Sequence, residues 1–193
     1  VTLNDGSCNY LDNGDHSLYF DGNDDNVLVN GLDDLGLDDN IVLEVYAKVV
    51  SSPAPGGHVR LFASDAGYHE SDKRFSISVE GRESGPVFEL NFNNSGNTGA
   101  HIHTNTFALN EWHHVMVSYD GSVARISLNG EEGETHSLSS SINFIEQSYF
   151  GANDPNYAHL HGFIDYIKIH DENELVGHWK FNEGTGDIVY DYS

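Results

Sequence analysis

Cysteine is almost absent from this sequence, and its shortage is informative. The 193 residues include a single cysteine, Cys8. One cysteine cannot form a disulfide within the chain, so internal cross-links are excluded. If the protein is secreted, a lone Cys8 predicts a disulfide partner outside this sequence.

Basic residues are also scarce. The chain has 8 Lys and Arg against 31 Asp and Glu, a formal net charge of −23. Such a charge repels phosphate groups, which excludes nucleic acid and anionic membrane surfaces as partners. Most of the acidic residues are expected to form a solvated surface, although the excess also suits a chain that collects divalent cations.

Long apolar runs are missing. No stretch of about 18 apolar residues exists, so no membrane insertion is expected. The opening residues "VTLNDGSCNY" have neither the basic start nor the apolar run of a signal peptide, and none is expected among them. The length fits one domain with a sizeable core.

Short alternating segments dominate, and no convincing helix is found. In "IVLEVYAKVV" the apolar residues of the inward face are Ile41, Leu43, Val45, Ala47 and Val49. "RFSISVE" alternates in the same way, and clusters such as "DGNDDN" and "NNSGNTG" separate the segments. Many short strands with one apolar face predict an all-β fold of two antiparallel sheets packed as a sandwich.

The segment "HGFIDYIKIH", residues 161–170, poses a question. Strict alternation puts Phe163, Asp165, Ile167 and Ile169 on one buried face. An unpaired buried carboxylate is too costly to keep, so Asp165 requires a cation, backbone N–H groups or a histidine.

Several segments carry a family resemblance. "SLYFDGNDDNVLV", "IVLEVYAKV", "NTFALNEWHHVMVSYDGSVARISLNGE", "FGAND" and "HGFIDYIKIHDENE" follow one another between residues 16 and 171. In this order they resemble the laminin-G-like, concanavalin A-like jelly-roll family, whose architecture pentraxins share. The resemblance implies two curved antiparallel sheets and, commonly, a bound calcium ion and glycan or cell-surface ligands.

The ends suggest a larger protein. Residues 1–15 contain "NDGSCNY", which resembles the close of a Cys-containing repeat in secreted marine-bacterial proteins. The jelly roll is expected over 16–193. Residues 175–193 resemble an opening strand, and either close this domain or begin another. Closure is favoured because Leu175, Trp179 and Phe181 need burial. The chain is thus expected to belong to a modular secreted or cell-surface protein, with neighbouring domains as partners.

The family resemblance implies a calcium site. The family's two calcium-binding aspartates correspond to Asp21 and Asp165, and the turn "DGNDDN" adds Asn23, Asp24 and Asp25. Calcium takes six to eight oxygen ligands, which such a turn can supply in part. Whether Asp24 or Asp25 ligates stays open, and Asp165 could instead accept backbone or histidine hydrogen bonds.

A ligand site is expected in the loops. By resemblance to pentraxins, Asp72, Asn153 and Asp154 would form a second acidic site, unless they only cap turns. Aromatic rings and polar side chains suit sugar binding. The loop residues expected to rim such a site are Tyr68, His69, Tyr157, His159 and His161, with Asn93, Asn94 and Asn97 nearby.

Two histidine pairs have chelating spacing. "HIH" (His101, His103) and "HLH" (His159, His161) each place two rings on one face of an extended segment, a pattern that can hold Zn²⁺ or Cu²⁺. The pairs are assigned to separate loops and complete no known metal motif. Hydrogen bonding in a lectin-like groove is therefore the preferred interpretation.

Motifs for catalysis are missing. No strand carries the Glu-x-Asp-x-(x)-Glu run of retaining glycosidases on this sandwich, and no "GxSxG" elbow occurs. The sequence therefore predicts a non-enzymatic, calcium-binding carbohydrate-recognition or adhesion module. The alternative is a structural or protein-interaction module in which calcium only rigidifies the fold; a glycan-active enzyme is less favoured.

Overall fold

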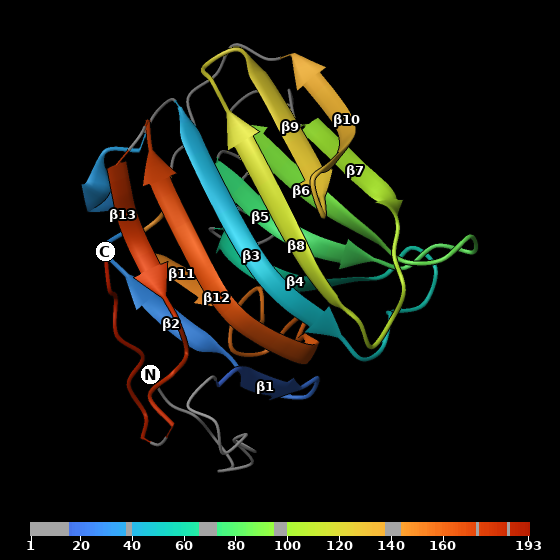
Figure 1. Cartoon of the computed structure of the whole chain (residues 1–193), viewed down its shortest axis with the longest axis horizontal. Helices are drawn as coiled ribbons and strands as arrows, with labels where there is room; N and C mark the ends of the chain where they lie inside the picture. The colour runs from blue at the N-terminus through green and yellow to red at the C-terminus, as the bar shows by residue number, and fades with distance from the viewer. Residues whose placement is uncertain are drawn as a thin grey trace.

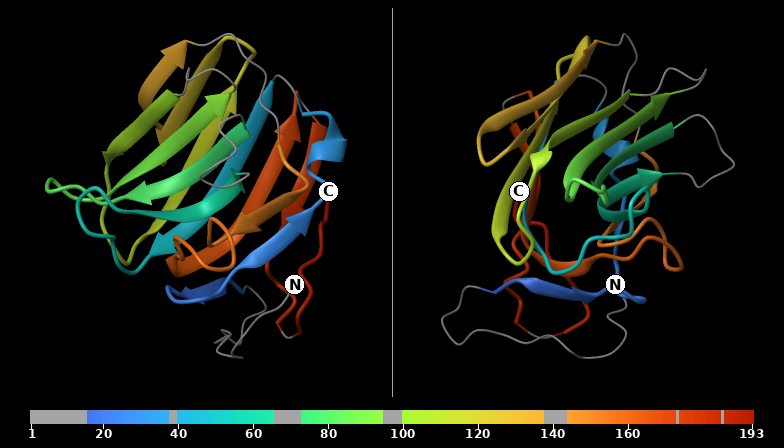
Figure 2. Two further views of the ribbon diagram at one scale, coloured as in Figure 1. Left: turned by 180° about the vertical axis from the view of Figure 1, so that it is seen from behind. Right: turned by 90° about the vertical axis from the view of Figure 1, so that its right-hand side faces the viewer.

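Two antiparallel sheets enclose the apolar faces of the strands, as the alternating pattern requires. The computed structural model describes residues 16–37, 40–65, 73–94, 100–137, 144–172, 174–184 and 186–193. Figure 1 shows one sheet in front of the other, and the right-hand view of Figure 2 shows the two layers from the side. The expected all-β, two-sheet sandwich is confirmed.

Sheet A has seven strands. Its order is β1 (Leu18–Asp21), β12 (His161–Asp171), β3 (Ile41–Val49), β8 (Trp112–Tyr119), β9 (Val123–Leu128) and β10 (Glu131–Ser137). The seventh strand, β13 (Glu174–Trp179), pairs with the later half of β12, whereas β1 pairs with the earlier half.

Sheet B has six strands and lies behind sheet A in Figure 1. Its order is β2 (Val27–Asn30), β11 (Gln147–Phe150), β4 (His58–Asp65), β5 (Lys73–Glu80), β6 (Val87–Asn94) and β7 (Ala100–Thr106). A single turn of 3₁₀ helix, η1 (Asp33–Leu35), follows β2. Strands β7 and β10, one from each sheet, lie close together at one side of the sandwich.

The core is rich in aromatic rings. The five inward residues of β3 are all 1% exposed or less, as alternation predicts. Opposite them, Phe62, Phe75 and Phe92 of sheet B pack edge to face, with ring centroids about 6 Å apart. Phe88 stacks on Phe107 at 4.1 Å. This core supports the outward faces of the strands.

The buried face expected for β12 is wrong in its first half. The register shifts between Ile164 and Tyr166, which makes Asp165 the extra residue of a β-bulge. The bulge changes the phase of alternation, so Ile164 and Ile167 are both fully buried. Phe163 and Asp165 are only half-buried, and Asp165 does not share the core with the isoleucines.

The C-terminal segment packs on the sandwich. Trp179 and Phe181 are buried against Phe150, with ring centroids 5.1 and 6.0 Å away. Leu175, also expected to be buried, is 37% exposed. The segment thus contributes both a strand to sheet A and aromatic rings to the core.

Candidate functional site

The outward surface of β4 to β7 is polar. Cross-strand register aligns Arg60, Ser78, Glu89 and His103 in one row, because directly paired residues point to the same side of a sheet. We call this surface the polar face. Its members are His58, Arg60, Ser76, Ser78, Glu80, Glu89, Asn91, His101 and His103. The four strands lie side by side in Figure 1.

Glu89 lies at the centre of the polar face. Its side chain is 2% exposed, and Nδ1 of His101 donates to Oε1 at 2.7 Å. Nδ1 of His58 lies 3.1 Å from Oε2, without the alignment of a hydrogen bond. Burial alone raises the pKa of Glu89, but the adjacent His58 and His101 outweigh it and lower the pKa to about 2. Glu89 is therefore a buried carboxylate at neutral pH.

His103 connects two carboxylates of sheet B with one of sheet A. Its Nδ1 donates to Oε2 of Glu134 at 2.8 Å, and Nε2 lies 3.4 Å from Glu80 and 3.7 Å from Glu89. The hydrogen bond from His103 lowers the pKa of Glu134. Oε2 of Glu80 also accepts from Nε of Arg82 at 2.7 Å.

This histidine–carboxylate cluster was missed in the sequence. The prediction that the "HIH" pair lies in a loop is wrong, because His101 and His103 lie on β7. Glu80, Glu89 and His103 offer ligand atoms within 4.8 Å of one another. The available signal was the alternation in "VFELNFN", which places Glu89 and Asn91 outward on the adjacent strand.

Four buried atoms of the polar face have unused hydrogen-bonding capacity. Among the described residues, Oγ of Ser76, Oδ1 of Asn91, Oε2 of Glu89 and Nδ1 of His58 are buried with no hydrogen-bond partner. Such atoms are rare in folded proteins because desolvation without a partner is costly. They make the polar face the candidate site of the described residues.

The turn after β1 gathers the predicted calcium-site acids. Asp21, Asp24 and Asp25 offer oxygens within 4.8 Å of one another. The backbone and side chain of Asn23 donate to Asp21 at 2.7 and 2.9 Å, and these bonds lower the pKa of Asp21. Asn23 therefore orients Asp21 by donating to it. Gly22 has a φ of +86°, and a Cβ there would lie 2.9 Å from that of His161.

Asp165 is not brought to this turn. Asp21 pairs with His161, and Asp165 lies four residues further along β12. At about 3.3 Å per residue, the separation along the strand is on the order of 10 Å. All-oxygen donors fit calcium, so the turn could hold the ion through Asp21, Asp24 and Asp25, without the predicted Asp165.

The described loop residues hold their own structure together. Asn153 is buried, and its Oδ1 accepts from Nε of Arg60 at 3.2 Å. Oδ1 of Asp154 accepts from the backbone N–H of Asn156 at 2.8 Å. Asp154 therefore caps the turn, which is the alternative to a ligand-binding role. Tyr157 is 56% exposed.

The second histidine pair joins neighbouring segments. Nδ1 of His159 donates to the carbonyl of Asp25 at 3.2 Å. Both ring nitrogens of His161 are engaged, with the Tyr19 hydroxyl at 3.2 Å and the Ser51 hydroxyl at 2.9 Å. Predicted site residues outside the described residues are Tyr68, His69, Asp72 and Asn97, and the same holds for the side chains of Asn93 and Asn94.

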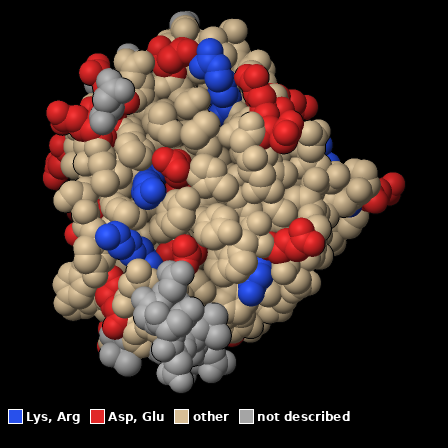
Figure 3. All heavy atoms as spheres, in the orientation of Figure 1, with Lys and Arg blue, Asp and Glu red and all other residues tan. Residues whose placement is uncertain are grey.

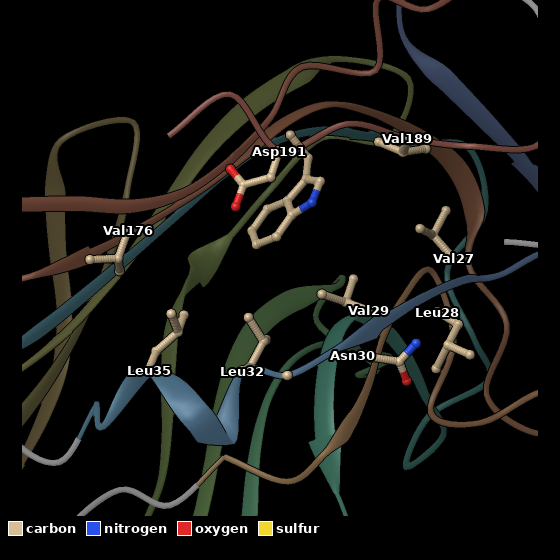
Figure 4. Close-up of a pocket in the computed structure, with 11 residues that line it drawn as sticks. Val27, Leu28, Val29, Asn30, Leu32, Leu35, Val176, Val189 and Asp191 are labelled. Atoms are coloured by element: carbon tan, nitrogen blue, oxygen red, sulfur yellow. The ribbon is translucent and has the colours of Figure 1, made fainter.

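An apolar pocket lies between β2 and the C-terminal segment. Its volume is about 270 Å³. Figure 4 shows its lining of Val27, Val29, Leu32, Leu35, Val176 and Val189, with Asp191 at one side. Asp191 accepts from the backbone N–H of His178 at 2.7 Å and so fixes the end of the C-terminal segment against β13. Few polar groups remain for a hydroxyl-rich ligand.

The outer side of sheet A carries aromatic rings whose faces are occupied. Tyr46 stacks on Trp112 at 5.2 Å and on Tyr166 at 5.7 Å. The Lys48 ammonium lies 4.3 Å from the Phe163 ring centroid. Figure 3 shows this side, where acidic groups gather mainly towards the margin. These rings pack against one another or beneath lysines, and so are poor platforms for a sugar.

The fold and its strand order define a laminin-G-like jelly-roll domain. A sequence model described as the concanavalin A-like lectin/glucanases superfamily matches residues 21–174, and the chain belongs to this superfamily. The resemblance seen in the sequence is confirmed. No curated protein sequence matches the chain significantly. No helix among the described residues is long and apolar enough to cross a membrane.

Solved structures share the fold at low sequence identity. Domains LG4-5 of the mouse laminin alpha1 chain match with a TM-score of 0.61 and 11% identity, over 83% of this chain and 42% of that one. The Ruminococcus gnavus IT-sialidase CBM40 bound to alpha2,3 sialyllactose matches with 0.62 and 11%, over 82% and 91%. The binding domain of botulinum neurotoxin serotype D matches with 0.60 and 12%, over 82% and 40%.

Proposed function

We propose that this protein is a carbohydrate-binding or adhesion module whose polar face on sheet B recognises a glycan. The observation that carries the proposal is the set of unsatisfied atoms on Ser76, Asn91 and Glu89. Sugar hydroxyls both donate and accept, so one ligand could satisfy an amide oxygen, a carboxylate oxygen and a serine hydroxyl together.

A ring beside these atoms supports the proposal. Tyr149 pairs with Ala63, and Ala63 pairs with Ser76, so the three point to the same side of sheet B. The residues between Tyr149 and Asn91, Ala63 and Ser76, are small, and an aromatic ring suits the apolar C–H face of a sugar. Burial raises the pKa of Tyr149, with a smaller contribution from Asp154, so its hydroxyl stays a neutral donor.

Charge favours a neutral glycan. The CBM40 neighbour was solved with sialyllactose, whose sialic acid carries a carboxylate. Here the net charge is −23 and Glu89 is ionised. The cation on the polar face, Arg60, already donates to Asn153. A carboxylated sugar would be repelled, so we expect neutral sugars to bind better than sialylated ones.

Calcium and location complete the proposal. A structural calcium ion would bind at Asp21, Asp24 and Asp25, where carboxylates converge away from the polar face. When bound, the ion would bridge these oxygen ligands and so stiffen the turn. The expected setting is secreted or at the cell surface, where glycans are available. A structural or protein-interaction module remains the competing function.

Catalysis is disfavoured by the protonation state of Glu89. Glu80 and Glu89 lie close enough to suggest a glycosidase pair, but retaining enzymes need one carboxyl protonated as the acid. Glu80 is paired with Arg82 at 2.6 Å, and the pKa of Glu89 is lowered to about 2. The environment of Glu89 thus favours the charged carboxylate, which cannot serve as the acid. We therefore propose binding without hydrolysis.

A glycan array with purified variants tests the proposal. We expect wild type to bind neutral glycans, and Asn91→Ala and Tyr149→Ala to weaken binding at least about tenfold, a loss of about 1.4 kcal/mol. The control is Tyr157→Ala, which alters the exposed loop and should leave affinity unchanged. A blank array, or binding lost only in the loop variant, would contradict glycan recognition by the polar face.

A further inference from the structure

The donor atoms around Glu89 have the spacing of ligands on one metal ion. Zinc binds histidine nitrogen and carboxylate oxygen at about 2.0–2.2 Å, which separates tetrahedral ligands by roughly 3.4 Å. Nε2 of His103 lies 3.4 Å from Oε2 of Glu80 and 3.7 Å from Oε1 of Glu89. The observed separations therefore need little adjustment to surround a cation.

A second observation concerns the same carboxylate. Oε2 of Glu89 and Nδ1 of His58 are both buried, lie 3.1 Å apart and have no hydrogen-bond partner among the described residues. Oε1 is the oxygen that lies towards His103, so an ion held through both oxygens of Glu89 would also give Oε2 a partner. The Glu89 side chain is 2% exposed, and a buried oxygen without a hydrogen bond is unusual.

Hydrogen bonds from neighbouring side chains orient the proposed ligands. Because Nδ1 of His103 donates to Glu134 at 2.8 Å, the other nitrogen, Nε2, is left bare towards Glu80 and Glu89. A carboxylate behind a histidine is the usual outer partner of a metal-bound imidazole. His101 donates to Oε1 of Glu89 at 2.7 Å and fixes the carboxylate in turn.

The local charge matches a divalent cation. Three carboxylates, on Glu80, Glu89 and Glu134, face one guanidinium, on Arg82. With the histidines neutral, three negative charges and one positive charge leave a formal charge of −2. A doubly charged cation would neutralise the cluster, and Oε2 of Glu80 would then be shared between the ion and Arg82, whose Nε and Nη2 lie 2.7 and 2.6 Å from it.

We propose that the polar face contains a transition-metal site, with His103, Glu89 and Glu80 as ligands and zinc as the best-fitting ion. Mixed imidazole and carboxylate donors favour zinc or copper over calcium, which prefers oxygen alone. The site is distinct from the aspartate turn after β1. It shares Glu89 with the proposed glycan surface but is argued from histidine geometry, so the two can be tested separately.

Isothermal titration of the whole chain with zinc chloride tests the proposal. The protein should be free of affinity tags, stripped with chelator, and kept in excess calcium to occupy any oxygen-only site. We expect one zinc per chain with a Kd of about 1 μM or tighter. Glu89→Gln, which keeps the shape of the side chain, and His103→Ala should each weaken binding at least about tenfold.

The matched control is His161→Ala, from the other H-x-H pair, whose ring nitrogens are already engaged. Its zinc affinity should equal that of wild type. Copper substitution followed by electron paramagnetic resonance should show nitrogen coupling that disappears in His103→Ala. Absence of saturable zinc binding, or equal affinity in all variants, would overturn the proposal. Glycan binding measured in chelator distinguishes failure of this site from failure of the binding function.

Discussion

Asp21 and Asp165 lie at opposite ends of the β1–β12 pairing. Asp21 is opposite His161, whereas Asp165 follows Ile164, which is opposite Leu18. If calcium binds the turn, its ligands are local to residues 21–25. We expect EGTA to lower the melting temperature of wild type and Asp165→Asn by the same amount, and to have little effect on Asp24→Asn. Differential scanning fluorimetry measures this, and a wild-type melting temperature indifferent to EGTA would exclude structural calcium.

Asn153 is expected to act in folding. Its buried Oδ1 accepts from Arg60, so Asn153→Ala leaves a buried guanidinium with one partner fewer. The free energy of unfolding should fall by about 1–3 kcal/mol in urea denaturation. The control Asn156→Ala changes an exposed side chain of the same turn and should stay within about 0.5 kcal/mol of wild type. Equal stability of the two variants would mean that the Arg60 contact contributes little.

The strand after the family match is expected to be indispensable. A chain ending at residue 173 loses β13 together with Trp179 and Phe181, and it uncovers the edge of β12. We expect a melting temperature at least about 10 °C lower, or insoluble protein. A chain ending at residue 184 keeps these groups and is the control. If the two truncated chains have the same melting temperature, the C-terminal segment does not contribute to the stability of the core.

His178 provides a test of pH dependence. Its burial, followed by the charges of Lys168 and Lys180, lowers its pKa from the usual 6.5. The unfolded chain then binds the proton more tightly, so the contribution of His178 to stability is complete above pH 6.5 and declines as the pH falls below it. NMR titration of the ring should give a midpoint under 6.5, and Lys168→Gln should raise it. A midpoint at or above 6.5 would contradict the assigned environment.

Alternation made the core of the fold predictable. The inward residues of β3 could be assigned from a single segment because period-two patterning is local and β3 is regular. The same rule failed at Asp165, since a bulge adds a residue without changing composition. Nothing within residues 161–170 marks that irregularity; it becomes evident only when the strand is paired with β3.

The candidate site was harder to predict for a related reason. Glu89 contacts His58 and His101, which come from strands on either side in the chain. Each residue alone is an ordinary polar group facing outward. Their convergence depends on register between strands, and register was not available from local patterns. The role of Asp154 could be predicted, because the hydrogen bond by which it caps its turn lies within that one turn.

The separation of inward and outward side chains along β4 to β7 has a consequence for diversification. Ile77 and Leu90 belong to the core, whereas Ser78 and Asn91, the residues next to them, point away from it. Outward positions lie outside the apolar core, so they can be exchanged without opening a cavity in it. The sandwich is suited to combinatorial libraries that randomise only this surface, and the same division would let natural lineages acquire new specificities without rebuilding the interior.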